Sequence, residues 1–121
     1  MIPSRLFRLE TAEDVLTVVP LLDMGEFNAD QVNEAGQVLL EQVDAAAEKN
    51  IVIDFSESDY FGSDALGLFV HLWKKAAARG GRIVFCGASD LEKEILLRAK
   101  FDHIGPICAG RAEALAALRQ P

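Results

Sequence analysis

The chain has 121 residues, of which 26% are charged and 50% are hydrophobic, and its formal net charge is −7. This length and balance are typical of one globular domain with its own core, and they disfavour a disordered chain. The excess of negative charge also disfavours a nucleic-acid backbone or an anionic membrane as partner, because both are polyanions. We therefore expect neutral or basic protein partners and no nucleic acid.

The sequence gives no sign of a membrane segment, a metal site or a cofactor. No stretch reaches the roughly 20 apolar residues of a membrane span, and the start MIPSRLFRLETAED turns acidic where a secretion signal would be apolar. We therefore expect a cytoplasmic protein without direct membrane insertion. The Cys and His residues are too isolated for a zinc site, and we interpret Cys86 and Cys108 as structural, reduced thiols.

The predicted elements begin with two strands, at residues 6–9 and 14–19, joined by a turn at residues 11–13. The second strand is rich in β-branched side chains, which favour extended backbone. The short connection between the strands predicts an antiparallel pair.

A long amphipathic helix is predicted to follow, from Asn28 to a point near Asn50. Asn28 is a suitable N-cap, and Gln31 stands where a reciprocal capping side chain would lie. Apolar residues recur every three or four positions, which predicts an inward stripe of Val32, Ala35, Leu39, Val43 and Ala46.

Residues 51–86 are predicted to form a strand, a helix and a second strand. The runs IVIDF (51–55) and RIVFCG (82–87) are continuously apolar, which is typical of strands covered on both faces. The helix at 64–79 ends at the Gly pair 80–81, and we expect a right-handed crossover between parallel strands. Its predicted inward stripe is Leu66, Val70, Trp73 and Ala77.

The C-terminal part predicts two further helices and a short strand. SDLE at 89–92 is a capping box and predicts a helix at 90–99. HIGPIC at 103–108 is predicted to be an edge strand, since Pro106 cannot donate to a ladder. RAEALAALR at 111–119 is the last predicted helix. The predicted inward residues are Leu91, Ile95 and Ala99 in the first helix and Ala114, Leu115 and Leu118 in the second.

Together these elements predict an α/β fold, with a mixed sheet of four or five strands and about four helices packed on it. No repeat, low-complexity tract or linker divides the chain, so residues 1–121 are predicted to form a single domain.

Acidic residues gather where the strand at 51–55 leads into the helix at 64–79, a kind of junction where open α/β sheets place ligands. They are Asp54, Glu57, Asp59 and Asp64. Catalysis is disfavoured, because no His precedes His71 to act as a base. Phosphorylation of Asp54, as in response-regulator receivers, would need a further acidic pair and a Lys that we do not find.

The start of the helix at residue 64 can itself be the functional element. Its free N–H groups favour an anion, either the carboxylate of Asp64 or a phosphate on Ser63. A purely structural interpretation is equally supported by the residue types: Ser63 as N-cap and Asp64 as a first-turn acid would together contribute about 1–2 kcal/mol.

The order of the elements and several motifs resemble the STAS domain, a family named for sulfate transporters and anti-sigma factor antagonists. The family's central motif is an apolar residue followed by Asp-Ser-Ser-Gly-Leu-Gly, and the corresponding run here is FGSDALG at 61–67. The Gly pair at 80–81, CGAS at 86–89 and the ending FDHIGPICAGRAEALAAL are similar to the family pattern as well.

In anti-sigma factor antagonists of this family, a partner kinase that is also the anti-sigma factor phosphorylates the second Ser of the motif, and phosphorylation prevents binding. By position, that Ser corresponds to Asp64. The resemblance implies a non-enzymatic module that docks an anti-sigma factor or related kinase-like regulator through the start of the helix at residue 64, without the usual serine switch. The implied surface comprises Asn28, Asp59, Gly62, Ser63, Asp64 and Ala65.

Several alternatives stay open at this point. Asp64 can imitate a phosphorylated state, or it can be a constitutive docking residue for an adapted partner, and Ser63 can be modified. An accessory subunit of a transporter that contacts its ATPase, or a signalling scaffold, is the second interpretation, and a receiver-like domain using Asp54 is the third. An exposed strand edge would also allow homo-oligomers.

Overall fold

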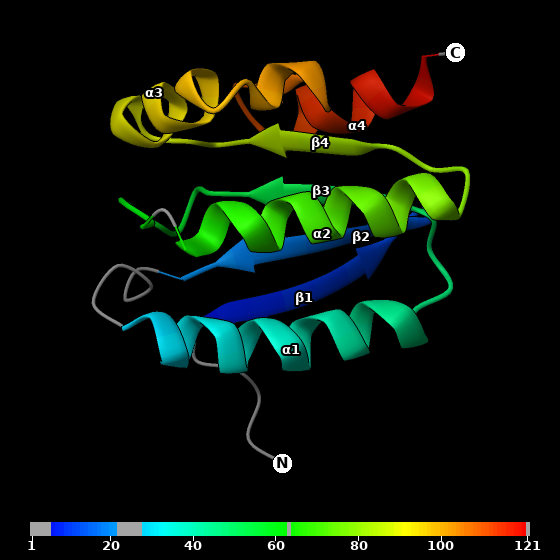
Figure 1. The fold of residues 1–121 in the computed structure, drawn as a ribbon. Coiled ribbons are helices and arrows are strands. Elements are labelled where there is room, and N and C mark those ends of the chain that lie inside the picture. Colours follow the sequence, from blue (N-terminus) through cyan, green and yellow to red (C-terminus); the bar gives the residue numbers. More distant parts are fainter. Residues whose placement is uncertain (1–5, 22–27, 63, 121) are drawn as a thin grey trace.

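A computed structural model describes residues 6–21, 28–62 and 64–120. Its five strands form one sheet in the order β1-β2-β3-β4-β5 (Figure 1). The first pair is antiparallel and the other three pairs are parallel, which confirms the predicted mixed sheet. The strands are β1 Phe7–Ala12, β2 Val15–Pro20, β3 Asn50–Asp54, β4 Ile83–Cys86 and β5 Ile107–Cys108.

Four α-helices pack on this sheet, as predicted. They are α1 Ala29–Ala45, α2 Asp64–Ala78, α3 Asp90–Arg98 and α4 Arg111–Arg119, and a 3-10 turn, η2, covers Phe101–His103. None of the helices in the described ranges is both long enough and apolar enough to cross a membrane.

The alternation of side chains along the strands gives the sheet two apolar faces. Ile51 and Ile53 of β3 join the larger cluster beneath α1 and α2, whereas Val52 between them joins a smaller cluster with Ala114 of α4. The larger cluster includes aromatic rings in tilted and edge-to-face contacts, from Phe55, Phe61, Phe69, Phe85 and Phe101. The smaller cluster also holds Cys86, which is buried and free, and the half-buried, free Cys108 packs against it.

Three predicted boundaries were wrong. The edge strand predicted at residues 103–108 is only Ile107–Cys108, because His103 belongs to the 3-10 turn η2. The β1–β2 turn consists of Glu13 and Asp14 rather than residues 11–13, and both have positive φ, 53° and 66°, as a two-residue type I′ hairpin requires. Helix α1 ends at Ala45 rather than near Asn50, because Asn50 already belongs to β3 and residues 46–49 are needed to bring the chain back to the sheet.

Two predicted inward faces were also displaced. The buried residues of α2 are Ala65, Leu68, Phe69, Leu72 and Ala76, while Leu66, Val70 and Trp73 are half-buried and Ala77 is exposed. Helix α2 contacts both α1 and the sheet, so its buried surface is wider than one stripe. In α3 the buried residues are Glu92 and Leu96, whereas Leu91 is 50% exposed and Ala99 is exposed.

Candidate functional site

The candidate site lies at the end of the sheet where β3 leads into α2 through the loop of residues 55–62. The starts of α1, α2 and α3 all lie at this end, on the left in Figure 1. Parallel topology places them there, since each helix follows the carboxyl end of a strand. The acidic junction noticed in the sequence therefore lies at the same end of the sheet as the starts of α1 and α3.

Asp64 is the first residue of α2 and is exposed. It lies at one end of a hollow between α1 and α2 with a volume of about 170 Å³. Polar groups from both helices line this hollow around an apolar floor. The lining residues are Val32, Asn33, Gly36, Gln37 and Leu40 of α1 and Asp64, Gly67, Leu68 and His71 of α2.

The other residues predicted for the surface have different roles. Asn28 is exposed and caps α1: its side chain accepts from the N–H of Gln31 at 2.8 Å, and the Gln31 side chain accepts from the N–H of Asn28 at 2.9 Å. Gly62 is half-buried, and its carbonyl accepts from the N–H of Ala65 at 3.1 Å. Ala65 is only 1% exposed, so its side chain belongs to the core and not to a docking surface.

Asp59 is exposed, and its backbone carbonyl accepts a hydrogen bond from the hydroxyl of Ser89 at 3.0 Å. Ser63 lies outside the described residues. The structure thus brings Asp64 next to polar residues of α1, and it connects the neighbourhood of Asp59 to the start of α3.

The loop before α2 also contacts α3 through a buried side-chain pair. The hydroxyl of Ser58, which is 5% exposed, donates to Oε2 of the fully buried Glu92 at 2.5 Å. Burial raises the pKa of Glu92, and the hydrogen bonds from Ser58 and from the Ser89 N–H oppose this rise.

Asp54, the alternative phosphoacceptor, is 3% exposed, and both its oxygens are engaged. Oδ2 lies 2.5 Å from Nε of Arg111, and Oδ1 accepts from the N–H of Ser56 at 2.9 Å. Burial alone would raise the pKa of Asp54, but the hydrogen bonds from Arg111 and Ser56 outweigh it and lower the pKa. A buried carboxylate already bound to a guanidinium is poorly placed to attack a phosphoryl donor, so the geometry argues against the receiver interpretation.

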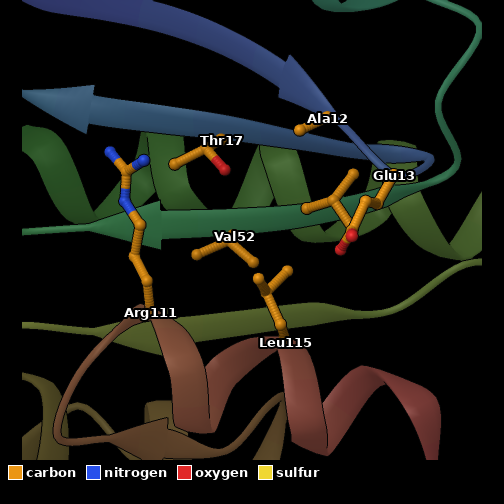
Figure 2. Close-up of a pocket in the computed structure, with 7 residues that line it drawn as sticks. Ala12, Glu13, Thr17, Val52, Arg111 and Leu115 are labelled. Carbon is orange, nitrogen blue, oxygen red and sulfur yellow. The ribbon is translucent and has the colours of Figure 1, made fainter.

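Arg111 is the centre of a charged network on the second face of the sheet. In Figure 2 its side chain extends from the start of α4 toward β2, on the side of the sheet that carries Thr17 and Val52. Its Nη1 lies 2.8 Å from Oε1 of Glu10, which also pairs with Arg8, and Arg8 pairs in turn with Glu57 of the loop. A small hollow of about 70 Å³ lies beside Arg111, lined also by Ala12, Glu13, Val15, Thr17, Val52 and Leu115.

A model of the STAS domain family matches residues 8–114. The chain belongs to the STAS domain family. No curated protein matches it by sequence. The match includes the acidic junction, α2 and α3, so the resemblance seen in the sequence is confirmed across the whole candidate site.

Solved structures show the same STAS fold. A protein from Thermotoga maritima, named as a candidate anti-sigma factor antagonist, has a TM-score of 0.80 at 19% identity, with 97% of each chain covered. An anti-sigma-factor antagonist (STAS) domain protein from Planctomyces limnophilus has a TM-score of 0.74 at 23% identity, covering 94% of this chain and 98% of that one. The unphosphorylated anti-sigma factor antagonist SpoIIAA has a TM-score of 0.75 at 16% identity, covering 93% and 96%.

SpoIIAA is also known in a phosphorylated form, described as a Bacillus cell fate determinant, with a TM-score of 0.68 at 17% identity over 93% of this chain and 99% of that one. At these identities the likeness establishes the fold of this STAS domain and leaves its partner and its regulation to be proposed.

Sequence reasoning missed the Ser58–Glu92 pair and the pairing of Arg111 with Asp54 in this STAS domain. The partners are 34 and 57 residues apart in the chain. Glu92 was recognised only as the local partner of Ser89 in a capping box. No local pattern indicates that its second oxygen faces a loop from another part of the chain.

Proposed function

We propose that this STAS domain is a non-enzymatic regulatory module of the anti-sigma factor antagonist type, which docks a protein partner around the first turn of α2. Family membership and the names of the solved relatives support this class of function. The observation that carries the proposal is the exposed carboxylate of Asp64 at the start of α2, beside the polar hollow between α1 and α2.

The partner in this proposal is an anti-sigma factor or a related kinase-like regulator in the cytoplasm. The surface offered to it centres on Asp64 and includes Asp59, Gly62 and Asn28, with Ser63 between Gly62 and α2. A negative charge at a helix start is stabilised by the helix dipole, so Asp64 presents a fixed anion there without modification. We propose that this domain therefore lacks the usual serine switch.

Binding experiments test the docking surface. Asp64→Lys should weaken the affinity for a purified anti-sigma factor about tenfold or more, as expected for a central interface residue, and Asp64→Ala should weaken it less. Isothermal titration calorimetry in the presence of ATP or ADP measures the affinities of both variants. If a panel of anti-sigma factors binds the wild type and Asp64→Lys equally well, the docking surface lies elsewhere.

Asp90→Lys is a matched control, because Asp90 is also an exposed acid at the first position of a helix, α3. Both substitutions remove a favourable charge from a helix start, so they should cost similar stability, about 0.3–1 kcal/mol. Only the change at Asp64 should strongly affect affinity.

Intact mass spectrometry tests the absence of the switch. After incubation with the bound kinase and ATP, we expect the wild type to keep its mass and Asp64→Ser to gain one phosphate. A phosphate on the wild type, for instance at Ser63, would overturn this part of the proposal.

A further inference from the structure

The loop of residues 55–62, which leads into α2, is fastened to the first turn of α3 by two neighbouring side-chain hydrogen bonds. The hydroxyl of Ser58 donates to Oε2 of Glu92 at 2.5 Å, and the hydroxyl of Ser89 donates to the carbonyl of Asp59 at 3.0 Å. We propose that Glu92 and Ser58 are positioning residues, which hold this loop, and with it the start of α2, in the shape that the partner recognises.

A comparison of the capping boxes of α1 and α3, the two found in the described residues, shows that Glu92 does more than cap its helix. In α1, Gln31 fills the equivalent position, is exposed and accepts a hydrogen bond from the N–H of Asn28, within the box. In α3, Glu92 makes the same local bond to the N–H of Ser89 through Oε1 at 3.0 Å, but it is fully buried and its other oxygen contacts Ser58. Burying a carboxyl group costs free energy that a helix cap does not require.

The hydroxyl of Ser58 can also bond to the chain just after β3. It lies 3.3 Å from the carbonyl of Phe55 as well as 2.5 Å from Glu92. A hydroxyl has one proton, so it can donate fully to only one of these acceptors at a time. Both contacts are satisfied together if residue 92 donates to Ser58, as a protonated Glu or a Gln side chain would, and Ser58 donates to Phe55.

Ser89 completes the connection, because its hydroxyl accepts from the N–H of Glu92 at 3.1 Å and donates to Asp59. Ser58 and Asp59 are thus each held by one member of the same capping box. On the opposite side, Glu57 pairs with Arg8 of β1. Three consecutive loop residues are therefore fixed from two directions, which limits how the chain can enter α2.

Three substitutions remove different parts of this set of hydrogen bonds. Ser58→Ala removes the bond to the loop and leaves both local bonds of the α3 capping box intact. Glu92→Gln retains the cap and can donate to Ser58, so it is the conservative variant. Glu92→Leu removes the cap and the bond to Ser58 together, while it keeps a side chain of similar size in the core.

Hydrogen exchange of the isolated protein, measured by mass spectrometry, tests the positioning role directly. We expect Ser58→Ala to speed exchange in residues 56–62 by about tenfold, as the loss of one buried hydrogen bond allows, and to leave α3 and β3 unchanged. Glu92→Gln should match the wild type, and Gln31→Ala should affect only α1. Unchanged loop exchange in Ser58→Ala, or a uniform rise over the whole chain, would overturn the inference.

The importance of the loop for docking rests on the proposed function, and a second measurement separates the two. Ser58→Ala should weaken the affinity for the anti-sigma factor by several-fold, and Glu92→Gln should retain wild-type affinity. If Asp64→Lys abolishes binding while Ser58→Ala frees the loop without any effect on affinity, the proposed docking surface stands and the positioning role is rejected. If no anti-sigma factor binds, the proposed function fails, and hydrogen exchange still decides whether Ser58 and Glu92 fix the loop.

Discussion

Arg111 and Asp54 form an ion pair that joins α4 to the carboxyl end of β3, with 2.5 Å between Nε and Oδ2. The Asp54 side chain is 5% exposed and that of Arg111 is 42% exposed, so the guanidinium covers the carboxylate from the solvent side. Arg111 also lies 2.8 Å from Glu10 of β1. One side chain thus connects an edge strand, a central strand and a helix across the second face of the sheet.

The network around this pair also lies over two buried residues of β2, Thr17 and Val19. Arg8 and Glu10 lie opposite Val19 and Thr17 in the β1–β2 register, on the face that carries α4. Val19 is fully buried and Thr17 is 8% exposed, although α4 contacts mainly β3, β4 and β5. The aliphatic parts of long charged side chains can shield apolar surface in this way while their ends remain paired.

Arg111→Ala should therefore destabilise the fold. The substitution leaves the carboxylate of Asp54 buried without its cation, which we expect to cost about 1–3 kcal/mol of unfolding free energy. Urea unfolding measures this loss. In a double-mutant cycle with Asp54→Ala, the combined loss should be smaller than the sum of the two single losses, because both changes remove the same contact. Full additivity would show that the ion pair is not the cause.

The same network predicts acid sensitivity. Hydrogen bonds from Arg111 and Arg8 lower the pKa of Glu10 from 4.5 to about 2, and the pKa of Asp54 is also lowered. A carboxyl group with a depressed folded-state pKa stabilises the fold above its unfolded value, and this contribution is lost as pH falls through the folded value. We expect the unfolding free energy to decrease between pH about 4.5 and about 2, and to decrease less in Arg111→Ala.

Glu92 should act in the opposite direction, since burial raises its pKa. It takes up a proton more readily in the folded state, so its protonation favours folding as pH falls through the raised value. Urea titrations of the wild type and of Glu92→Gln at a series of acidic pH values separate the contribution of Glu92 from that of Glu10 and Asp54. If Arg111→Ala shows the same decrease with pH as the wild type, the acid sensitivity comes from other groups.

The sequence predicted those features that depend on neighbours in the chain. Both capping boxes, at Asn28 and at Ser89, were recognised because their partners lie three residues away. The parallel order of β3 and β4 followed from two apolar runs around one helix. The inward faces predicted for α2 and α3 were wrong, because contacts with distant residues decide which face is buried. Phe69 packs against Phe55 and Phe61, and Glu92 turns inward toward Ser58.

In the candidate site, too, only features that depend on neighbours in the chain were predictable. The position of Asp64 at a helix start was predictable from the motif and is confirmed. The burial of Ala65 was not, because an alanine at the second position of a helix can face either the core or the solvent. The hollow beside Asp64 depends on how closely α1 approaches α2, and Gly36 lies at this contact, where an added Cβ would come within 3.3 Å of Leu68.

Gly87→Ala should destabilise the fold at the end of β4. Gly87 has φ of +72°, and a Cβ there would lie 2.7 Å from Oδ1 of Asp54 and 3.0 Å from the N–H nitrogen of Ser56. Strain at positive φ and the displacement of Asp54 should together cost about 1–3 kcal/mol. Thermal or urea unfolding measures this loss.

Gly67→Ala is the control for that substitution. Gly67 lies inside α2, and an added Cβ would meet nothing within 4 Å. Alanine should therefore stabilise the helix by up to about 1 kcal/mol. A stable Gly87→Ala variant would show that the chain can adjust around Asp54.

Arg79→Met should weaken the C-terminal end of α1. Helix α1 has no basic residue in its last turn, and Arg79, just after α2, donates to the carbonyl of Val43 and to that of Glu48, the latter at 2.8 Å. Loss of these bonds should cost about 1 kcal/mol and speed hydrogen exchange near the end of α1. Lys74→Met, a change at an exposed position five residues earlier, should leave both quantities unchanged. Equal behaviour of the two variants would contradict this role of Arg79.

Asn28 allows helix capping to be separated from partner docking. Asn28→Ala removes the side chain that accepts from the N–H of Gln31 and should cost about 1 kcal/mol, whereas Asn28→Ser keeps a capping oxygen and should stay near wild-type stability. If Asn28 also touches the partner, Asn28→Ser should lower the affinity for the anti-sigma factor without lowering the melting temperature. If affinity falls only in Asn28→Ala, and in proportion to the lost helix stability, Asn28 serves the surface by capping α1 and the contact with the partner belongs to other residues.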